Sequence, residues 1–89
     1  MTLVIRRRAT AGTMQSSDLT VVVEPADRLE IRIESTVKKQ YEDAIRGRIE
    51  EVLRRQGVTT GLVQVSDRGA LDYAIEARVE AALRRAAGE

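Results

Sequence analysis

The sequence predicts a small α+β domain. We expect a two-layer sandwich, in which a mostly antiparallel sheet of three to four strands is covered by two helices. Apolar and polar residues alternate over 19–24 and again over 29–34, which predicts two strands. Apolar residues recur at helical spacing over 37–53 and 71–86, which predicts two helices. A short apolar stretch at 62–65 lies between the helices and predicts one more strand.

The first two of these strands are joined by a short turn. Residues 24–27 read EPAD and contain the only proline of the chain. Two alternating strands with a short turn between them are typical of an antiparallel hairpin, so we expect strands 19–24 and 29–34 to pair. If 29–34 and 62–65 are parallel, the connection through the first helix is a right-handed crossover.

A fourth strand is expected before the hairpin. Residues 10–15 are predicted to pair with 19–24, which places Ser16 and Ser17 at the end of a tight turn. The full order of elements is then β-β-β-α-β-α.

The ends of the first helix carry recognisable signals. Ser35 or Thr36 is expected to cap its start, and Gly57 suits the left-handed position after its end. Gly47 lies inside it and costs about 1 kcal/mol relative to alanine, unless it permits close packing. The second helix is expected to carry Leu71 on its apolar face and to end at Gly88.

The composition excludes several classes of chemistry. The chain has no cysteine and no histidine, so it contains neither a Ser–His–Asp triad nor a Cys/His zinc site, and we expect no metal. Asp67, Asp72 and Glu76 are better explained by a turn and by the first turn of a helix than by catalysis. We therefore expect a chain with no catalytic residues of its own.

Charge and hydropathy argue against nucleic acids and membranes as partners. Lys and Arg number 15 against 14 Asp and Glu, and neither Trp nor Phe occurs, so we expect no nucleic-acid partner. No apolar run approaches the roughly 20 residues that span a bilayer, and the start lacks the charge order of a signal peptide. We expect a cytoplasmic protein whose residues 1–89 form one domain, with 1–8 a flexible basic segment.

The stretch AGTMQSSD, residues 11–18, leaves three readings open. Ser16, Ser17 and Asp18 form a hydrogen-bonded turn, or one serine is a site of covalent modification, or one is a nucleophile. The last reading would need a lysine or carboxylate base, and the only lysines, Lys38 and Lys39, are at the start of the first helix.

Three segments together resemble one family. AGTMQSSD before an alternating strand, then STVKKQYEDAIRGRIEEVLRRQGV, then VQVSDRGALDYAIEARVEAALRRA, resemble the acyl carrier protein, or gamma subunit, of citrate lyase. The carrier subunit of citramalate lyase is closely similar. The resemblance extends from about Ala9 to Ala87, and its most specific parts are AGT-x-x-S-x-D and GALD followed by AR-x-E. A malonate decarboxylase carrier subunit ranks lower.

The resemblance implies a carrier role for a chain that is not itself an enzyme. In that family, the serine of AGT-x-x-S-x-D, here Ser16, carries 2'-(5''-phosphoribosyl)-3'-dephospho-CoA through a phosphodiester. The thiol of this group carries acetyl and citryl thioesters between the alpha subunit (acyl/CoA transferase) and the beta subunit (acyl lyase), and a prosthetic-group transferase attaches it. We add the expectation that Arg6 to Arg8 contact its phosphates. An unmodified scaffold domain of the same fold is the alternative.

Overall fold

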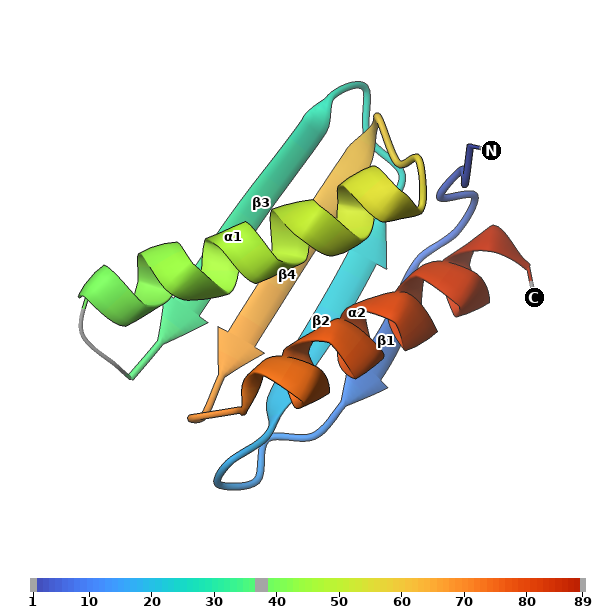
Figure 1. The fold of residues 1–89 in the computed structure, drawn as a ribbon. Coiled ribbons are helices and arrows are strands. Elements are labelled where there is room, and N and C mark those ends of the chain that lie inside the picture. The colour runs from blue at the N-terminus through green and yellow to red at the C-terminus, as the bar shows by residue number, and fades with distance from the viewer. Residues whose placement is uncertain (1, 37–38, 89) are drawn as a thin grey trace.

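The computed structural model describes residues 2–36 and 39–88. Its elements confirm the expected α+β sandwich and its order (Figure 1). The elements are β1 (Ala9–Gly12), β2 (Leu19–Glu24), β3 (Leu29–Ser35), α1 (Lys39–Arg55), β4 (Gly61–Asp67) and α2 (Asp72–Ala87). Both helices lie on one face of a four-stranded sheet.

The order of strands in the sheet is β1-β2-β4-β3. The predicted pairing of 10–15 with 19–24 is confirmed only for 10–12, because β1 is antiparallel to β2 over Ala9–Gly12 and residues 13–15 belong to the loop. The predicted hairpin of β2 with β3 is wrong: β4 lies between them, antiparallel to β2 and parallel to β3. A two-residue period shows which residues form strands, but it does not show which strands are neighbours in the sheet.

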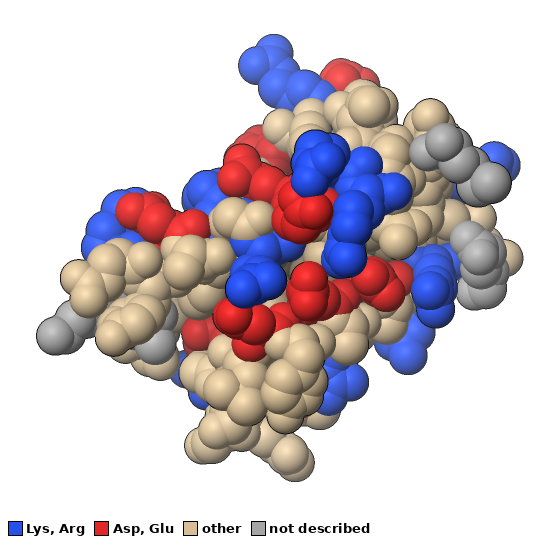
Figure 2. Space-filling view, viewed as in Figure 1, with Lys and Arg blue, Asp and Glu red and all other residues tan. Residues whose placement is uncertain are grey.

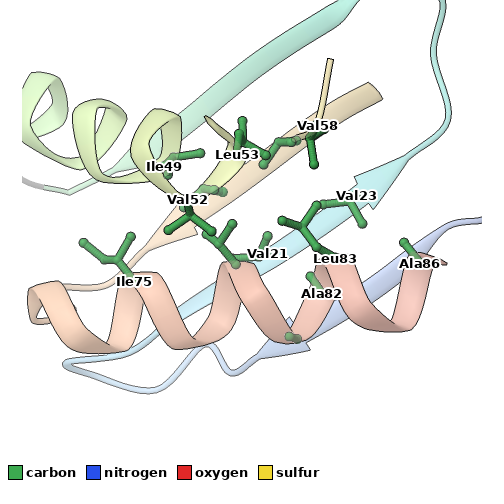
Figure 3. Packing of buried hydrophobic residues seen from close by; sticks show 14 of the residues in the cluster. Val21, Val23, Ile49, Val52, Leu53, Val58, Ile75, Ala82, Leu83 and Ala86 are labelled. Carbon is green, nitrogen blue, oxygen red and sulfur yellow. The ribbon is translucent and has the colours of Figure 1, made fainter. Parts of the chain in front are cut away.

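The core lies between the sheet and the helices (Figure 3). β2 and β4 alternate buried and half-buried residues over their whole lengths, so that one face of each strand is turned towards the helices. The largest fully buried side chains of the core are Leu19, Ile49, Leu53, Ile75, Leu83, Val21, Val23, Val52, Val63, Val65 and Val79. Both aromatic residues, Tyr41 and Tyr73, are exposed, so aliphatic side chains alone fill this core.

The ends of the helices differ in part from expectation. Ser35 is the last residue of β3 and donates to Asp67 Oδ2 at 3.1 Å. The expected cap of the first helix at Ser35 or Thr36 stays a prediction, because residues 37–38 lie outside the described residues. Val37, at the start of the predicted stripe, lies outside the described residues. A Cβ at Gly47 would meet nothing within 4 Å, so the close-packing explanation is wrong. Leu71 precedes α2 and is 59% exposed, whereas Gly88 ends α2 with φ 94° as predicted.

A ladder of ion pairs joins the outer surfaces of the two helices (Figure 2). Arg48 of α1 pairs with Asp72 and Glu76 of α2, and Arg55 pairs with Glu76 and Glu80. Within α2, Glu80 also pairs with Arg84 at 4.0 Å. These partly exposed pairs contribute little each, but they favour this one alignment of the helices.

The segment before β1 packs against the ends of both helices. Ile5 is 5% exposed and belongs to the core. The N–H of Leu3 donates to Gln56 after α1, and the N–H groups of Arg6 and Arg7 donate to the carbonyl of Ala86 in α2. Figure 1 shows the segment before β1 and the end of α2 at the same end of the molecule.

Candidate functional site

The candidate serine lies in a loop at the opposite end of the sheet from the chain ends. Residues 13–18 connect β1 to β2, and Figure 1 shows this loop extending past the end of the sheet. Leu19 at the start of β2 faces Asp67 at the end of β4, so the turn between β4 and α2 lies beside the loop. The loop is therefore supported by elements that are distant in the sequence.

Gly12 lets the chain enter the loop. Its φ is +96°, in the region that favours glycine, and a Cβ there would lie 1.9 Å from the carbonyl oxygen of Leu19. The N–H of Thr13 donates to that same carbonyl at 3.1 Å and closes the base of the loop. The glycine of the AGT motif is thus required by a close backbone approach.

Ser16 and Ser17 occupy the two central positions of a four-residue turn. The N–H of Asp18 donates to the carbonyl of Gln15 at 3.2 Å. Ser17 has φ 65° and is the only residue other than glycine with positive φ among those described. The third position of such a turn adopts positive φ in type II geometry, which favours glycine or asparagine.

Two backbone hydrogen bonds connect the loop to the turn after β4. The N–H of Ser17 donates to the carbonyl of Arg68 at 2.8 Å, and the N–H of Arg68 donates to the carbonyl of Asp18 at 2.9 Å. Two residues of the loop therefore face one residue of the neighbouring segment, which is a β-bulge. Bulges change the direction of a strand and of its side chains, and this one lies directly after Ser16.

Asp18 connects the loop to α2. Arg78 donates to both of its carboxylate oxygens, at 3.2 and 2.8 Å. The hydroxyl of Thr13 donates to Oδ2 at 2.6 Å, and the N–H of Leu19 donates to Oδ1 at 2.8 Å. The hydrogen bonds from Arg78, Thr13 and Leu19 hold the pKa of Asp18 well below its ordinary range, so the carboxylate is charged and fully engaged.

The loop does not use the hydroxyls of its two serines. Ser16 and Ser17 are exposed, and within the described residues neither hydroxyl makes a hydrogen bond. The side chains of Thr13 and Asp18 form hydrogen bonds that hold the loop, and Gly12 provides the backbone conformation at its start. A rigid loop that presents a free hydroxyl suits covalent attachment, whereas a nucleophile would need a neighbouring base.

The basic run at Arg6 to Arg8 lies elsewhere. Arg7 donates to the carbonyl of Arg85 near the end of α2, and Arg8 pairs with Glu24 at the end of β2. Both contacts are at the opposite end of β1 from the serine loop, since β1 contributes four residues of about 3.3 Å each between them. Nearness in the sequence is not nearness in space here.

Two arginines near the loop were given no role by the sequence patterns. Arg78 belongs to the AR-x-E motif and Arg68 precedes the GALD motif, and the contacts described above bring both to the loop. The only sign of a role in the sequence was that both arginines lie in or beside a family motif. The amphipathic pattern of α2 does not show that Arg78 contacts a loop residue 60 positions earlier.

The candidate carboxylates have structural partners, as expected. Asp67 is 2% exposed and accepts from the N–H groups of Gly69 and Ala70, which forms the turn before α2. Asp72, the first residue of α2, pairs with Arg48. In the described part of the chain, no three acidic residues gather in a way that would hold a metal ion. Nor is any described helix long and apolar enough to cross a membrane.

Sequence comparisons match this chain to acyl carrier proteins. Residues 6–86 match the family "ACP: Malonate decarboxylase delta subunit (MdcD)". The citrate lyase acyl carrier protein of Haemophilus influenzae (strain Rd) is 47% identical over 96% of this chain and 90% of that protein. Those of Enterobacter sp. (strain 638) and Streptococcus uberis are 51% and 49% identical, over 96% and 94% of this chain and 89% and 84% of theirs.

The fold is also found in a solved structure. A chain in the crystal structure of a Pseudomonas malonate decarboxylase hetero-tetramer in complex with malonate superposes with a TM-score of 0.79. The two chains are 24% identical, and the match covers 94% of this chain and 88% of that one. At this identity the likeness establishes a shared fold.

Proposed function

The chain belongs to the citrate lyase acyl carrier protein family, and from this we propose that it is the acyl carrier subunit of a citrate or citramalate lyase complex. Its attachment residue in this proposal is Ser16. The observation that carries the proposal is the exposed hydroxyl of Ser16, which the loop presents but does not use. The register of Ser16 with Gly12, Thr13 and Asp18 distinguishes it from Ser17.

The prosthetic group of the proposal is 2'-(5''-phosphoribosyl)-3'-dephospho-CoA. When bound, it supplies a thiol for thioester chemistry. The loop fits such a group because Ser16 is exposed on a turn that hydrogen bonds hold from both sides. A fixed root limits the volume that a tethered group explores and so raises its effective concentration at neighbouring active sites.

Attachment would use the Ser16 hydroxyl as a nucleophile towards an activated phosphate of the precursor, so that the Ser16 O–P bond forms as the bond from that phosphorus to its phosphate leaving group breaks. A base must accept the hydroxyl proton. Asp18 is poorly suited, because its pKa is low and Arg78 and Thr13 occupy its oxygens. The base therefore belongs to the prosthetic-group transferase, which is in keeping with a chain that is itself not an enzyme.

The partners follow from the same proposal. An alpha subunit (acyl/CoA transferase) and a beta subunit (acyl lyase) would hold the catalytic residues, in the cytoplasm. The malonate decarboxylase type of carrier is the second candidate, because both the matching family and the similar solved structure bear that name. The identities of 42–51% to citrate lyase carriers favour the first.

Intact mass spectrometry tests the proposal. The chain is produced together with its modifying enzyme, beside Ser16→Ala and the matched control Ser17→Ala. We expect a mass increase equal to the prosthetic group in the wild type and in Ser17→Ala, and none in Ser16→Ala. An adduct that persists in Ser16→Ala would refute the assignment, and a wild type without adduct would favour an unmodified scaffold domain.

A further inference from the structure

Three arginines have side chains without a partner in the described part of the chain. Within residues 2–36 and 39–88, the side chains of Arg6, Arg28 and Arg68 make no hydrogen bond and no ion pair. The other arginines in these ranges form ion pairs with carboxylates or donate to backbone carbonyls. Unpaired guanidinium groups are the available anion-binding groups of the surface.

Only one of the three lies at the end of the sheet that carries Ser16. Arg6 donates its N–H to Ala86 near the end of α2, and the carbonyl of Arg28 accepts from Gly61 at the start of β4. Both contacts are at the far end of the sheet. Arg68 follows β4 and exchanges two backbone hydrogen bonds with the bulge at Ser17 and Asp18.

The position of Arg68 relative to Ser16 is fixed by the backbone. Its carbonyl is 2.8 Å from the nitrogen of Ser17, and Ser16 is the preceding residue. The alternation along β4 puts Asp67 on the helix side, where Gly69, Ala70 and Ser35 satisfy its carboxylate. Arg68 is the next residue, is only partly buried, and by the same alternation lies on the other face.

The charges around the loop leave Arg68 uncompensated. Asp18 is the only carboxylate in the loop, and Arg78 neutralises it through two hydrogen bonds. A phosphodiester on Ser16 would add one negative charge that no described side chain of the loop offsets. Arginine matches phosphate oxygens with two parallel N–H donors, which a lysine does not.

We propose that Arg68 binds the phosphodiester that joins the prosthetic group to Ser16. Arg68 acts as a positioning residue: it holds the first charged linkage of the arm against the end of β4 and limits the directions in which the arm leaves the loop. This inference rests on the proposed attachment to Ser16. It extends that proposal by naming the group that receives the linkage.

The test uses the full chain after modification, as wild type, Arg68→Gln, Arg68→Lys and the matched control Arg28→Gln. Arg28 is also without a side-chain partner in the described residues, so Arg28→Gln removes the same charge at the other end of the sheet. Intact mass first establishes the adduct in each protein. The ³¹P resonance of the serine-linked phosphodiester and the Nε–H resonance of Arg68 are then recorded by NMR.

We expect the ³¹P resonance to move in Arg68→Gln, to move less in Arg68→Lys, and to stay in place in Arg28→Gln. In the wild type, modification should shift the Arg68 Nε–H resonance and slow its exchange with solvent by roughly 2- to 5-fold, the scale of an exposed charge pair. This wild-type measurement decides the matter even if Arg68→Gln takes up no adduct. The slowing should weaken at high salt.

Two results overturn the inference in different ways. If all adducts form but Arg68→Gln and Arg28→Gln leave the ³¹P resonance alike, and modification leaves the Arg68 resonance unchanged, Arg68 does not bind the linkage and the carrier proposal stands. If the wild type acquires no adduct on Ser16, the carrier proposal fails and this inference fails with it.

Discussion

Arg78 donates hydrogen bonds to both carboxylate oxygens of Asp18, although 60 residues separate them in the sequence. The contact joins the loop that carries Ser16 to the middle of α2. Because Asp18 also binds the hydroxyl of Thr13 and the N–H of Leu19, one carboxylate organises the loop, its base and its attachment to a helix. The loop is thus part of the packed structure and not an appendage of it.

The role of Asp18 predicts a pH dependence of stability. The pKa of Asp18 in the folded state lies below the ordinary value of 3.8. At pH values between the folded and the unfolded pKa, the unfolded chain therefore binds more protons than the folded chain. The stabilisation by Asp18 is therefore complete above about pH 4–5 and is lost as the pH falls through the folded pKa. In urea unfolding, the difference between wild type and Asp18→Asn should shrink from pH 6 to pH 2.

The charge-matched control for Asp18 is Asp27→Asn. Asp27 is exposed in the turn between β2 and β3 and makes no ion pair with the described residues. We expect this variant to stay close to the wild type at each pH. A difference for Asp18→Asn that is constant from pH 6 to pH 2 would contradict the pairing with Arg78.

Gly12→Ala should destabilise the chain severely. The added Cβ would lie 1.9 Å from a backbone oxygen, and φ is +96°. We expect a loss of about 3 kcal/mol or more in the free energy of unfolding. Gly47→Ala is the matched control: its Cβ meets nothing within 4 Å, so it should stabilise α1 by about 1 kcal/mol. Equal effects of the two substitutions in urea unfolding would refute this account.

Ser17→Gly should stabilise the loop. Ser17 has φ 65°, which costs a residue with a Cβ about 1 kcal/mol, and glycine is free of this cost. Because glycine also has more freedom to lose on folding, we expect a net gain of about 0.5 kcal/mol in thermal or urea unfolding. Ser16→Ala, at an exposed position, should change stability by less than about 0.5 kcal/mol. A large loss in Ser16→Ala would mean that the serine has a structural partner.

The ladder between the helices should be weak and sensitive to salt. Glu76 lies 4.0 Å from Arg48 and 3.4 Å from Arg55, and these side chains are 31–45% exposed. Glu76→Gln is therefore expected to cost less than about 1 kcal/mol at low salt and less still at 1 M salt. Glu50→Gln, at an exposed site of α1, is the control and should not respond to salt. A salt-independent loss in Glu76→Gln would argue against ion pairing.

Residue periodicity was sufficient for the order of the elements and for most of their buried faces, although Leu71, predicted on the apolar face of the second helix, precedes α2 and is exposed. Leu19, Val21 and Val23 are fully buried, as their alternation predicted. Periodicity did not identify the neighbour of β3, because β3 and β2 are each compatible with the same partner strand and only the assembled sheet places β4 between them. The contact of Asp18 with Arg78 could not be predicted for the same reason, since it depends on where α2 crosses the end of β2.

The attachment of the loop to α2 sets an order of events during synthesis. β4 and α2 leave the ribosome after the loop, yet the turn at Ser16 depends on Arg68, which follows β4, and Asp18 depends on Arg78 in α2. A nascent chain that has exposed only its first half has the serines but not the conformation that presents them. An enzyme that reads the finished loop would then act only on completed, folded chains.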